Sequence, residues 1–223
     1  MKLHDLSEQN VRIIRIASGT ATLAALYRPV LRRLLTWGAS PSEAGEALPG
    51  DALLAGADGV STRAIDIDAA PRHVFPWLVQ MGPGPRGGAY TYDWIENLLG
   101  LDMHSVDCVL PEFQQPEVGD TISLGPNYMR LERLEPDHVL AWRSQDRHWV
   151  WSFVLRRTGA GTRLISRNRF ALPSAMGRLG MIAMAPASLV MERKMLLGIK
   201  QRAERLAADA PPDREPRGAL TRH

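Results

Sequence analysis

The sequence predicts an α+β fold in which a run of short antiparallel strands is followed by one long helix. From residue 120 onward, five segments with strand-like composition are separated by turn signals. Directly after them, residues 185–206 carry apolar side chains at helical spacing, with Leu189, Leu196 and Ile199 on one arc. Short strands joined by tight turns form an antiparallel meander, so we expect the sheet to pack against the apolar arc of this helix.

Residues 1–59 are expected to form a helical extension and a linker. Residues 11–35 are apolar in blocks, but arginines leave only 12 uncharged residues from Ile16 to Tyr27, and a bilayer span needs about 20. We interpret this segment as an amphipathic helix on the domain, with weak membrane-surface contact as the alternative. Ser40 to Glu43 reads as a capping box that starts a short helix, and residues 52–59 read as a linker.

The main domain is expected at residues 60–208. It begins with an alternating strand at 61–68, which turns through Pro71 into a helix at 72–80. The Gly- and Pro-rich segment 81–88 reads as a loop. It lacks the Gly-Lys-Ser/Thr of a phosphate loop and the dinucleotide-binding pattern, so no nucleotide and no other cofactor is expected.

A second helix is expected at 92–99 and mainly loop at 101–119. Residues 209–223 combine prolines with charges and are expected to be a disordered tail. The strands of the meander are expected at 121–124, 128–134, 139–145, 149–157 and 162–170.

Composition excludes several classes of protein. The formal net charge of +3 is small for the 223 residues, and there is no aromatic-basic motif, so no nucleic-acid partner is expected. The single cysteine, Cys108, excludes an internal disulfide, fits a cytoplasmic location and is expected to be a small buried residue. No signal peptide is apparent, and no zinc-site spacing occurs, so no metal is expected.

Three segments carry a resemblance to a known superfamily. The strand-to-helix junction AIDIDAAPRHVFPWL at 64–78 resembles the opening of SRPBCC proteins, which include START lipid-transfer domains, Bet v 1-like proteins and polyketide cyclase/dehydrase-like proteins. Residues 90–105, YTYDWIENLLGLDMHS, and 190–200, VMERKMLLGIK, resemble one bacterial branch. The resemblance, over residues 37–207, implies a helix-grip fold: a curved antiparallel sheet around a long C-terminal helix, with a ligand cavity between them.

Glu192 is the strongest candidate for a functional residue, because its expected position is energetically unfavourable for a carboxylate. It falls into the apolar arc of the long helix, where a lone carboxylate is costly unless it is paired or protonated. One interpretation is an ion pair with an arginine of the sheet, Arg63, Arg167 or Arg169. The other is a cavity group that binds ligand or acts as an acid or base.

His104 and Asp107 could form a polarised pair in which the carboxylate fixes the histidine tautomer, although two residues make no catalytic triad. A loop histidine and a capping aspartate are the alternative. Ligand contacts are predicted from the short second helix, from the aromatic face of the strand at 149–157 and from neighbouring positions. The predicted ligand-binding residues are Tyr92, Asp93, Trp94, Tyr128, Trp142, Trp149, Trp151, Phe153, Asn168 and Met195.

The favoured function is the binding of a hydrophobic, lipid-like or polyketide-like small molecule between the sheet and the C-terminal helix. Two alternatives stay open. The first is a cyclase- or dehydratase-type enzyme that uses Glu192 or His104 to move a proton. The second is a lipid-handling protein at a membrane surface that uses residues 11–35.

Overall fold

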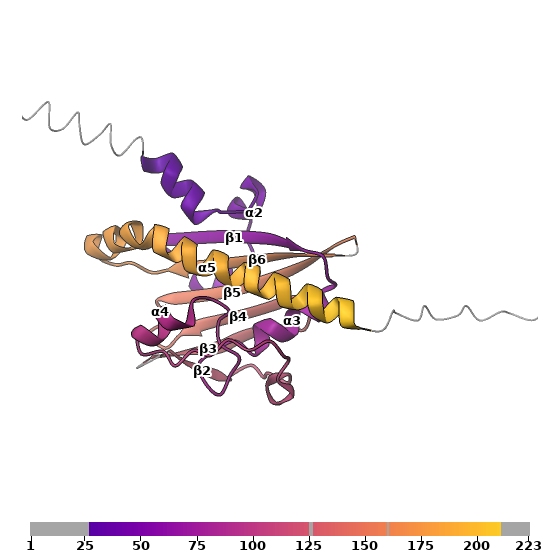
Figure 1. Ribbon diagram of the computed structural model, residues 1–223. Helices are drawn as coiled ribbons and strands as arrows, with labels where there is room; N and C mark the ends of the chain where they lie inside the picture. Colours follow the sequence, from indigo (N-terminus) through magenta and orange to yellow (C-terminus); the bar gives the residue numbers. More distant parts are fainter. Residues whose placement is uncertain (1–26, 125–126, 160, 211–223) are drawn as a thin grey trace, which may run out of the picture.

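The computed structural model describes residues 27–124, 127–159 and 161–210. Its strands form one antiparallel sheet in the order β1-β6-β5-β4-β3-β2, and the long helix α5 lies across one face (Figure 1). This arrangement confirms the α+β helix-grip architecture. The strands are β1 (Gly59–Ile67), β2 (Thr121–Leu124), β3 (Asn127–Glu135), β4 (Val139–Ser144), β5 (Trp149–Thr158) and β6 (Gly161–Phe170). The helices are α2 (Pro41–Gly45), α3 (Pro71–Val79), α4 (Asp93–Leu98) and α5 (Ala175–Asp209), with 3-10 turns η1 (Asp51–Leu54) and η2 (Pro111–Phe113).

The main core lies between the sheet and the second half of α5. Leu196, Ile199 and Ala203 of α5 are fully buried and pack with α3 and with the strands. These residues recur at helical spacing, as the sequence predicts, and burying such a stripe supplies most of a helix's stability in a folded domain. The meander matches the predicted strands within a residue or two at each end.

The other face of the sheet is covered by α2 and η1. Ser40 caps α2 through the predicted capping box. Glu43 then accepts hydrogen bonds from Arg163 of β6 at 2.8 and 2.9 Å. Asp51 accepts a bond of 2.7 Å from Arg167. The segment interpreted as a linker is partly a 3-10 turn docked on the sheet, where the carbonyls of Leu54 and Ala55 accept hydrogen bonds from Arg169 of β6.

The helix α5 starts at Ala175, earlier than the sequence pattern indicates. Ser174 caps it by accepting a hydrogen bond from Gly177 N at 3.0 Å. Pro186 lies inside the helix and has no N–H to donate to the carbonyl of Ile182. The hydroxyl of Tyr27 donates to that carbonyl at 3.2 Å. A side chain from another segment thus satisfies the acceptor that the proline leaves open.

The first helix is described only from residue 27, and residues 27–35 are helical. The remainder of the predicted helix at 11–35, like the predicted tail beyond residue 210, lies outside the described residues. Gly38, with φ of 73°, ends this segment as the sequence predicts. A Cβ on Gly38 would lie 2.1 Å from the carbonyl oxygen of Ala64, so only glycine permits this approach to β1.

Candidate functional site

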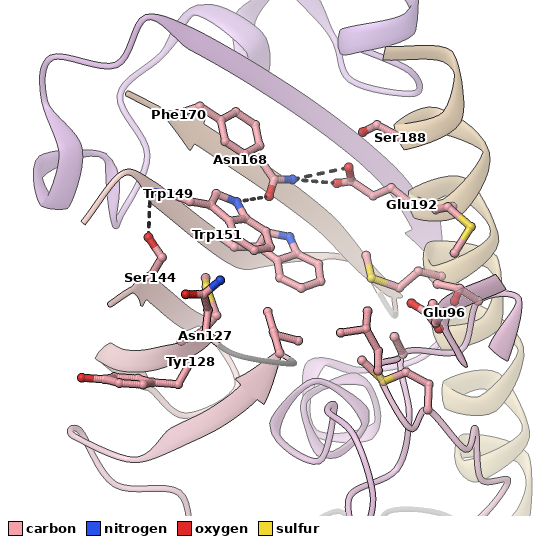
Figure 2. A pocket seen from close by; sticks show the side chains of 18 residues that line it. Glu96, Asn127, Tyr128, Ser144, Trp149, Trp151, Asn168, Phe170, Ser188 and Glu192 are labelled. Carbon is pink, nitrogen blue, oxygen red and sulfur yellow. Dashed lines mark hydrogen bonds between the residues drawn. The ribbon is translucent and has the colours of Figure 1, made fainter. Parts of the chain in front are cut away.

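A cavity of about 470 Å³ lies between α5, α4 and the end of the sheet at which β5 begins (Figure 2). The strands and α5 supply most of its wall, and α4 with the segments before and after it supplies the remainder. The lining residues are Ala89, Thr91, Glu96, Leu101, Met103, Leu124, Asn127, Tyr128, Met129, Ser144, Trp149, Trp151, Asn168, Phe170, Ser188, Met191, Glu192 and Met195. The lining is mainly apolar with a few polar groups, which is the usual composition of a small-molecule site.

Aromatic rings of β5 and β6 form one wall. Trp149 and Trp151 are stacked with centroids 5.8 Å apart, and Phe170 lies 6.0 Å from Trp149. Strand alternation places Trp149 and Trp151 on the same face, as the sequence predicts. Phe153 shares that face, but it is buried in the core beyond the cavity, as is Trp142. The predicted ligand contacts of these two residues are not supported by their positions.

Both indole groups are held by hydrogen bonds. Trp149 Nε1 donates to Asn168 Oδ1 at 2.8 Å, and Trp151 Nε1 donates to Ser166 Oγ at 3.0 Å. Ser166 Oγ in turn donates to Glu192 Oε1 at 2.6 Å. The amide nitrogen of Asn168 lies 3.4 Å from both oxygens of Glu192, as Figure 2 shows. The orientation of the aromatic wall is therefore coupled to this carboxylate.

Glu192 forms an ion pair with Arg63 of β1. Arg63 is completely buried and also donates to Ser188 Oγ at 3.0 Å and to the carbonyl of Leu34 at 3.0 and 3.2 Å. Burial raises the pKa of Glu192, while the Arg63 guanidinium and the Ser166 hydroxyl act in the opposite direction. Glu192 thus has an arginine partner and also lines the cavity.

Strand register explains why Arg63 is the partner. Arg63 is directly opposite Ser166 in the β1–β6 ladder, so both side chains point toward α5. Arg167 and Arg169 point to the opposite face of the sheet. They bond there to groups around η1, including Asp51. Of the three arginines considered as partners of Glu192, only Arg63 lies on the face of the sheet that α5 covers.

Glu96 is a second carboxyl group of the cavity and is not among the predicted site residues. It is 9 % exposed, and its Oε2 has no hydrogen-bond partner in the described part of the chain. Burial raises its pKa, the Thr91 hydroxyl lowers it, and the Asp93 carboxylate raises it. The sequence places Glu96 in the short helix expected to border the cavity, but it does not predict that Glu96 faces inward, because an apolar pair such as Trp94 and Leu98 normally faces the interior.

The structure separates His104 from Asp107. His104 Nε2 lies 3.0 Å from Asp102 Oδ1 on the surface, and the carboxylate of Asp107 pairs with Arg202 at 2.8 Å. Neither residue lines the cavity. The predicted polarised pair is wrong, because each side chain pairs with a different residue, His104 with Asp102 and Asp107 with Arg202.

Several further predictions are corrected at the short helix. Asp93 accepts hydrogen bonds from the backbone and hydroxyl of Ser105 at 2.7 and 2.6 Å, so it holds a loop. Tyr92 lies beneath the ammonium group of Lys194 at 5.8 Å. Trp94 is 68 % exposed, and these three residues do not line the cavity. Cys108 is exposed instead of buried.

The remaining predicted contacts lie at the cavity. Tyr128, Trp149, Trp151, Asn168 and Met195 all line it, and their roles in ligand binding stay predictions. Among the described residues, no cluster of three or more His, Cys, Asp or Glu side chains could hold a metal ion. None of the described helices has the length and apolar character needed to cross a membrane.

The curved antiparallel sheet, the long helix α5 across it and the cavity between them define a helix-grip fold. No protein-family model and no curated protein matches the chain. Among solved structures, the chain is similar to the polyketide-cyclase-like protein Cgl2372 from Corynebacterium glutamicum, with 16 % identity, coverage of 66 % of this chain and 88 % of that one, and a TM-score of 0.34.

The chain is also similar to Aha1 from Colwellia psychrerythraea, with 15 % identity, coverage of 66 % and 96 %, and a TM-score of 0.41. For protein MLL2253 from Mesorhizobium loti the identity is 18 %, the coverage 65 % and 97 %, and the TM-score 0.38. At these identities the likeness concerns the fold alone, and the function has to be argued from the cavity.

Proposed function

We propose that the protein binds a hydrophobic small molecule in the cavity between α5 and the sheet. The observation that carries the proposal is the cavity itself: about 470 Å³, lined by aromatic, methionine and leucine side chains. Small-molecule sites are concave and mostly apolar, with few polar groups that orient the ligand. The methionines Met191 and Met195 supply a surface that adapts to different ligand shapes.

The first test is native mass spectrometry of protein purified from its own host, followed by solvent extraction. A reproducible hydrophobic adduct is expected. The matched variants are Met191→Trp, which fills the cavity, and Met184→Trp, which alters an α5 side chain that is 61 % exposed. We expect the first variant to lose the adduct and the second to retain it. Equal occupancy in the two variants, or no adduct in any sample, would contradict the proposal.

The acid–base enzyme receives less support from the geometry. Glu192 is held by Arg63, Ser166 and Asn168, and His104 faces solvent. A general acid or base has to come within hydrogen-bond reach of its substrate. His104 does not border the cavity, and Glu192 would first have to exchange a partner that is already bound.

A second candidate function is lipid handling at a membrane surface, favoured by exposed apolar side chains beside the cavity. Leu98 and Leu99 are 79 % and 73 % exposed at the end of α4. Met176, Leu179, Met184 and Val190 are exposed on the first half of α5, which lies at the same end of the molecule (Figure 1). Apolar side chains that flank basic ones, here Arg178 and Lys194, are typical of interfacial binding.

Vesicle flotation tests this candidate. We expect the protein to float with vesicles of phosphatidylcholine and phosphatidylglycerol, and the double variant Leu98→Asp/Leu99→Asp to remain at the bottom. Val118→Asp, at an exposed position outside α4, is the control. A further variant lacking residues 1–26 separates the predicted contribution of the N-terminal segment. Equal flotation of the control and the double variant would exclude the α4 surface.

A further inference from the structure

Glu96 has features that packing alone does not explain. Its side chain comes from α4, lines the cavity and is 9 % exposed, and Figure 2 shows it on the opposite side from Tyr128. Its Oε2 is buried without a hydrogen-bond partner in the described residues. A buried polar atom that lacks a partner costs free energy, so such atoms are rare unless a ligand or ion completes them.

The surroundings of Glu96 offer no compensating cation. In the described part of the chain no lysine or arginine forms an ion pair with it, and the charged side chain that acts on it is that of Asp93, which accepts hydrogen bonds from Ser105. The hydroxyl of Thr91, also on the cavity wall, lies close enough to Glu96 to lower the pKa of that carboxyl, but it makes no hydrogen bond of normal geometry within the described residues. Glu192 differs from Glu96 in this respect, since it lines the same cavity and is paired with the buried Arg63.

We propose that Glu96 is the polar anchor of the site and binds a cationic nitrogen of the ligand, which makes an apolar amine the preferred class. This rests on the proposed function of the cavity. An ammonium group would supply the positive charge that is missing beside Glu96 and a hydrogen-bond donor for its Oε2. Hydrogen bonds to charged groups are stronger than those between neutral groups. The apolar part of the ligand would contact the wall formed by Trp149 and Trp151.

The same arrangement selects against other ligands. A carboxylate on the ligand would meet Glu96 and Asp93 as like charges, which is unfavourable in a poorly solvated site. A hydroxyl could donate to Oε2 but would bring no charge. The expected order of affinity is therefore amine, then alcohol, then the unsubstituted hydrocarbon, with the carboxylate weakest.

The test is calorimetric titration with four naphthalene probes substituted at the same ring position: naphthylmethylamine, naphthylmethanol, methylnaphthalene and naphthoate. The protein is the full chain, Glu96→Gln, or Glu112→Gln as a control at an exposed glutamate. We expect the amine to bind the wild type roughly tenfold more tightly than methylnaphthalene. Glu96→Gln should abolish this preference without changing the affinity for methylnaphthalene, and Glu112→Gln should leave both unchanged.

The outcomes separate the two proposals. Retained binding of methylnaphthalene by Glu96→Gln shows that the variant is folded and its cavity intact. If the wild type binds methylnaphthalene but shows no preference for the amine, or if Glu96→Gln keeps the preference, the anchor role is overturned and the cavity proposal stands. If the wild type binds none of the four probes, both proposals are overturned.

Discussion

Arg63 is the residue at which three parts of the fold meet. Its guanidinium pairs with Glu192 of α5, binds Ser188 and caps the carbonyl of Leu34 at the end of the N-terminal helix. A buried charge is tolerated only when its partners are complete. Arg63 therefore fixes the position of the carboxylate that holds the aromatic wall, and the cavity depends on it indirectly.

Replacing Arg63 by Met should destabilise the protein by about 3–5 kcal/mol, because it leaves the Glu192 carboxylate buried without its counter-ion. The double variant Arg63→Met/Glu192→Met removes both charges and should lose less than the single one. Urea unfolding of the double variant and of the two single variants, Arg63→Met and Glu192→Met, measures the difference. If the double variant loses as much as the two single changes added together, the residues do not act as a pair.

The packing of α5 against the loop before α4 depends on one glycine. A Cβ on Gly198 would lie 2.8 Å from both Cβ and the carbonyl oxygen of Tyr90. Tyr90 itself has φ of 59° and donates to the carbonyl of Trp77 at 3.0 Å, so it cannot move freely. Helix, loop and α3 therefore meet at a contact that admits no side chain at position 198.

Gly198→Ala should cost about 1–3 kcal/mol of stability through overpacking. Gly180→Ala is the matched control, since Gly180 lies in the same helix with nothing within 4 Å of its added Cβ. That control should gain about 0.5–1 kcal/mol from helix propensity. Thermal unfolding of the two variants is the measurement, and a shift of the same sign in both would contradict the role given to Tyr90.

The docking of α2 should make stability depend on pH in the acid range. Hydrogen bonds from Arg163 lower the pKa of Glu43 from 4.5 to about 2. A carboxyl with a lowered folded-state pKa contributes stability above pH 4.5, which is lost as the pH falls toward 2. Glu43→Gln should lose about 1–2 kcal/mol at neutral pH and approach the wild type at low pH. Denaturant unfolding across this range tests it, and a pH-independent difference would contradict the ion-pair explanation.

At the scale of the whole molecule, the main packed core and the cavity lie at different ends of the sheet. The second half of α5 packs with α3 in the main core, and α2 with η1 covers the other face around Ala64, Val154 and Ile165. The first half of α5 extends past this core, with Met184 and Val190 exposed. The cavity lies beside the middle of α5. The free energy of folding therefore comes mainly from the separate core, and the cavity can stay empty.

If the cavity binds a ligand, the ligand should stabilise the folded state of the whole domain against unfolding. A bound ligand at a concentration a hundred times its dissociation constant should raise the free energy of unfolding by about 2.7 kcal/mol. Methylnaphthalene and a thermal unfolding assay are sufficient for the measurement. Met191→Trp should unfold at a temperature that the probe does not change, and a shift equal to that of the wild type would place the binding elsewhere.

Local patterns in the sequence determine the elements. Alternation specifies β1 and β3–β6, the capping box specifies α2, and the helical spacing of Leu196 and Ile199 specifies the buried stripe of α5. These signals are read over a few neighbouring residues, and the structure confirms them. The same alternation correctly predicts that Trp149 and Trp151 share a face, and both line the cavity.

Tertiary structure alone decides which groups share the site. Alternation assigns a face but no position along the sheet, so Phe153 and Trp142 fall in the core while Phe170 reaches the cavity. The choice of Arg63 for Glu192 follows from its register opposite Ser166, and the inward turn of Glu96 follows from how α4 docks. The physical reason is that a cavity is space which packing leaves empty, and that space depends on contacts between residues far apart in the chain.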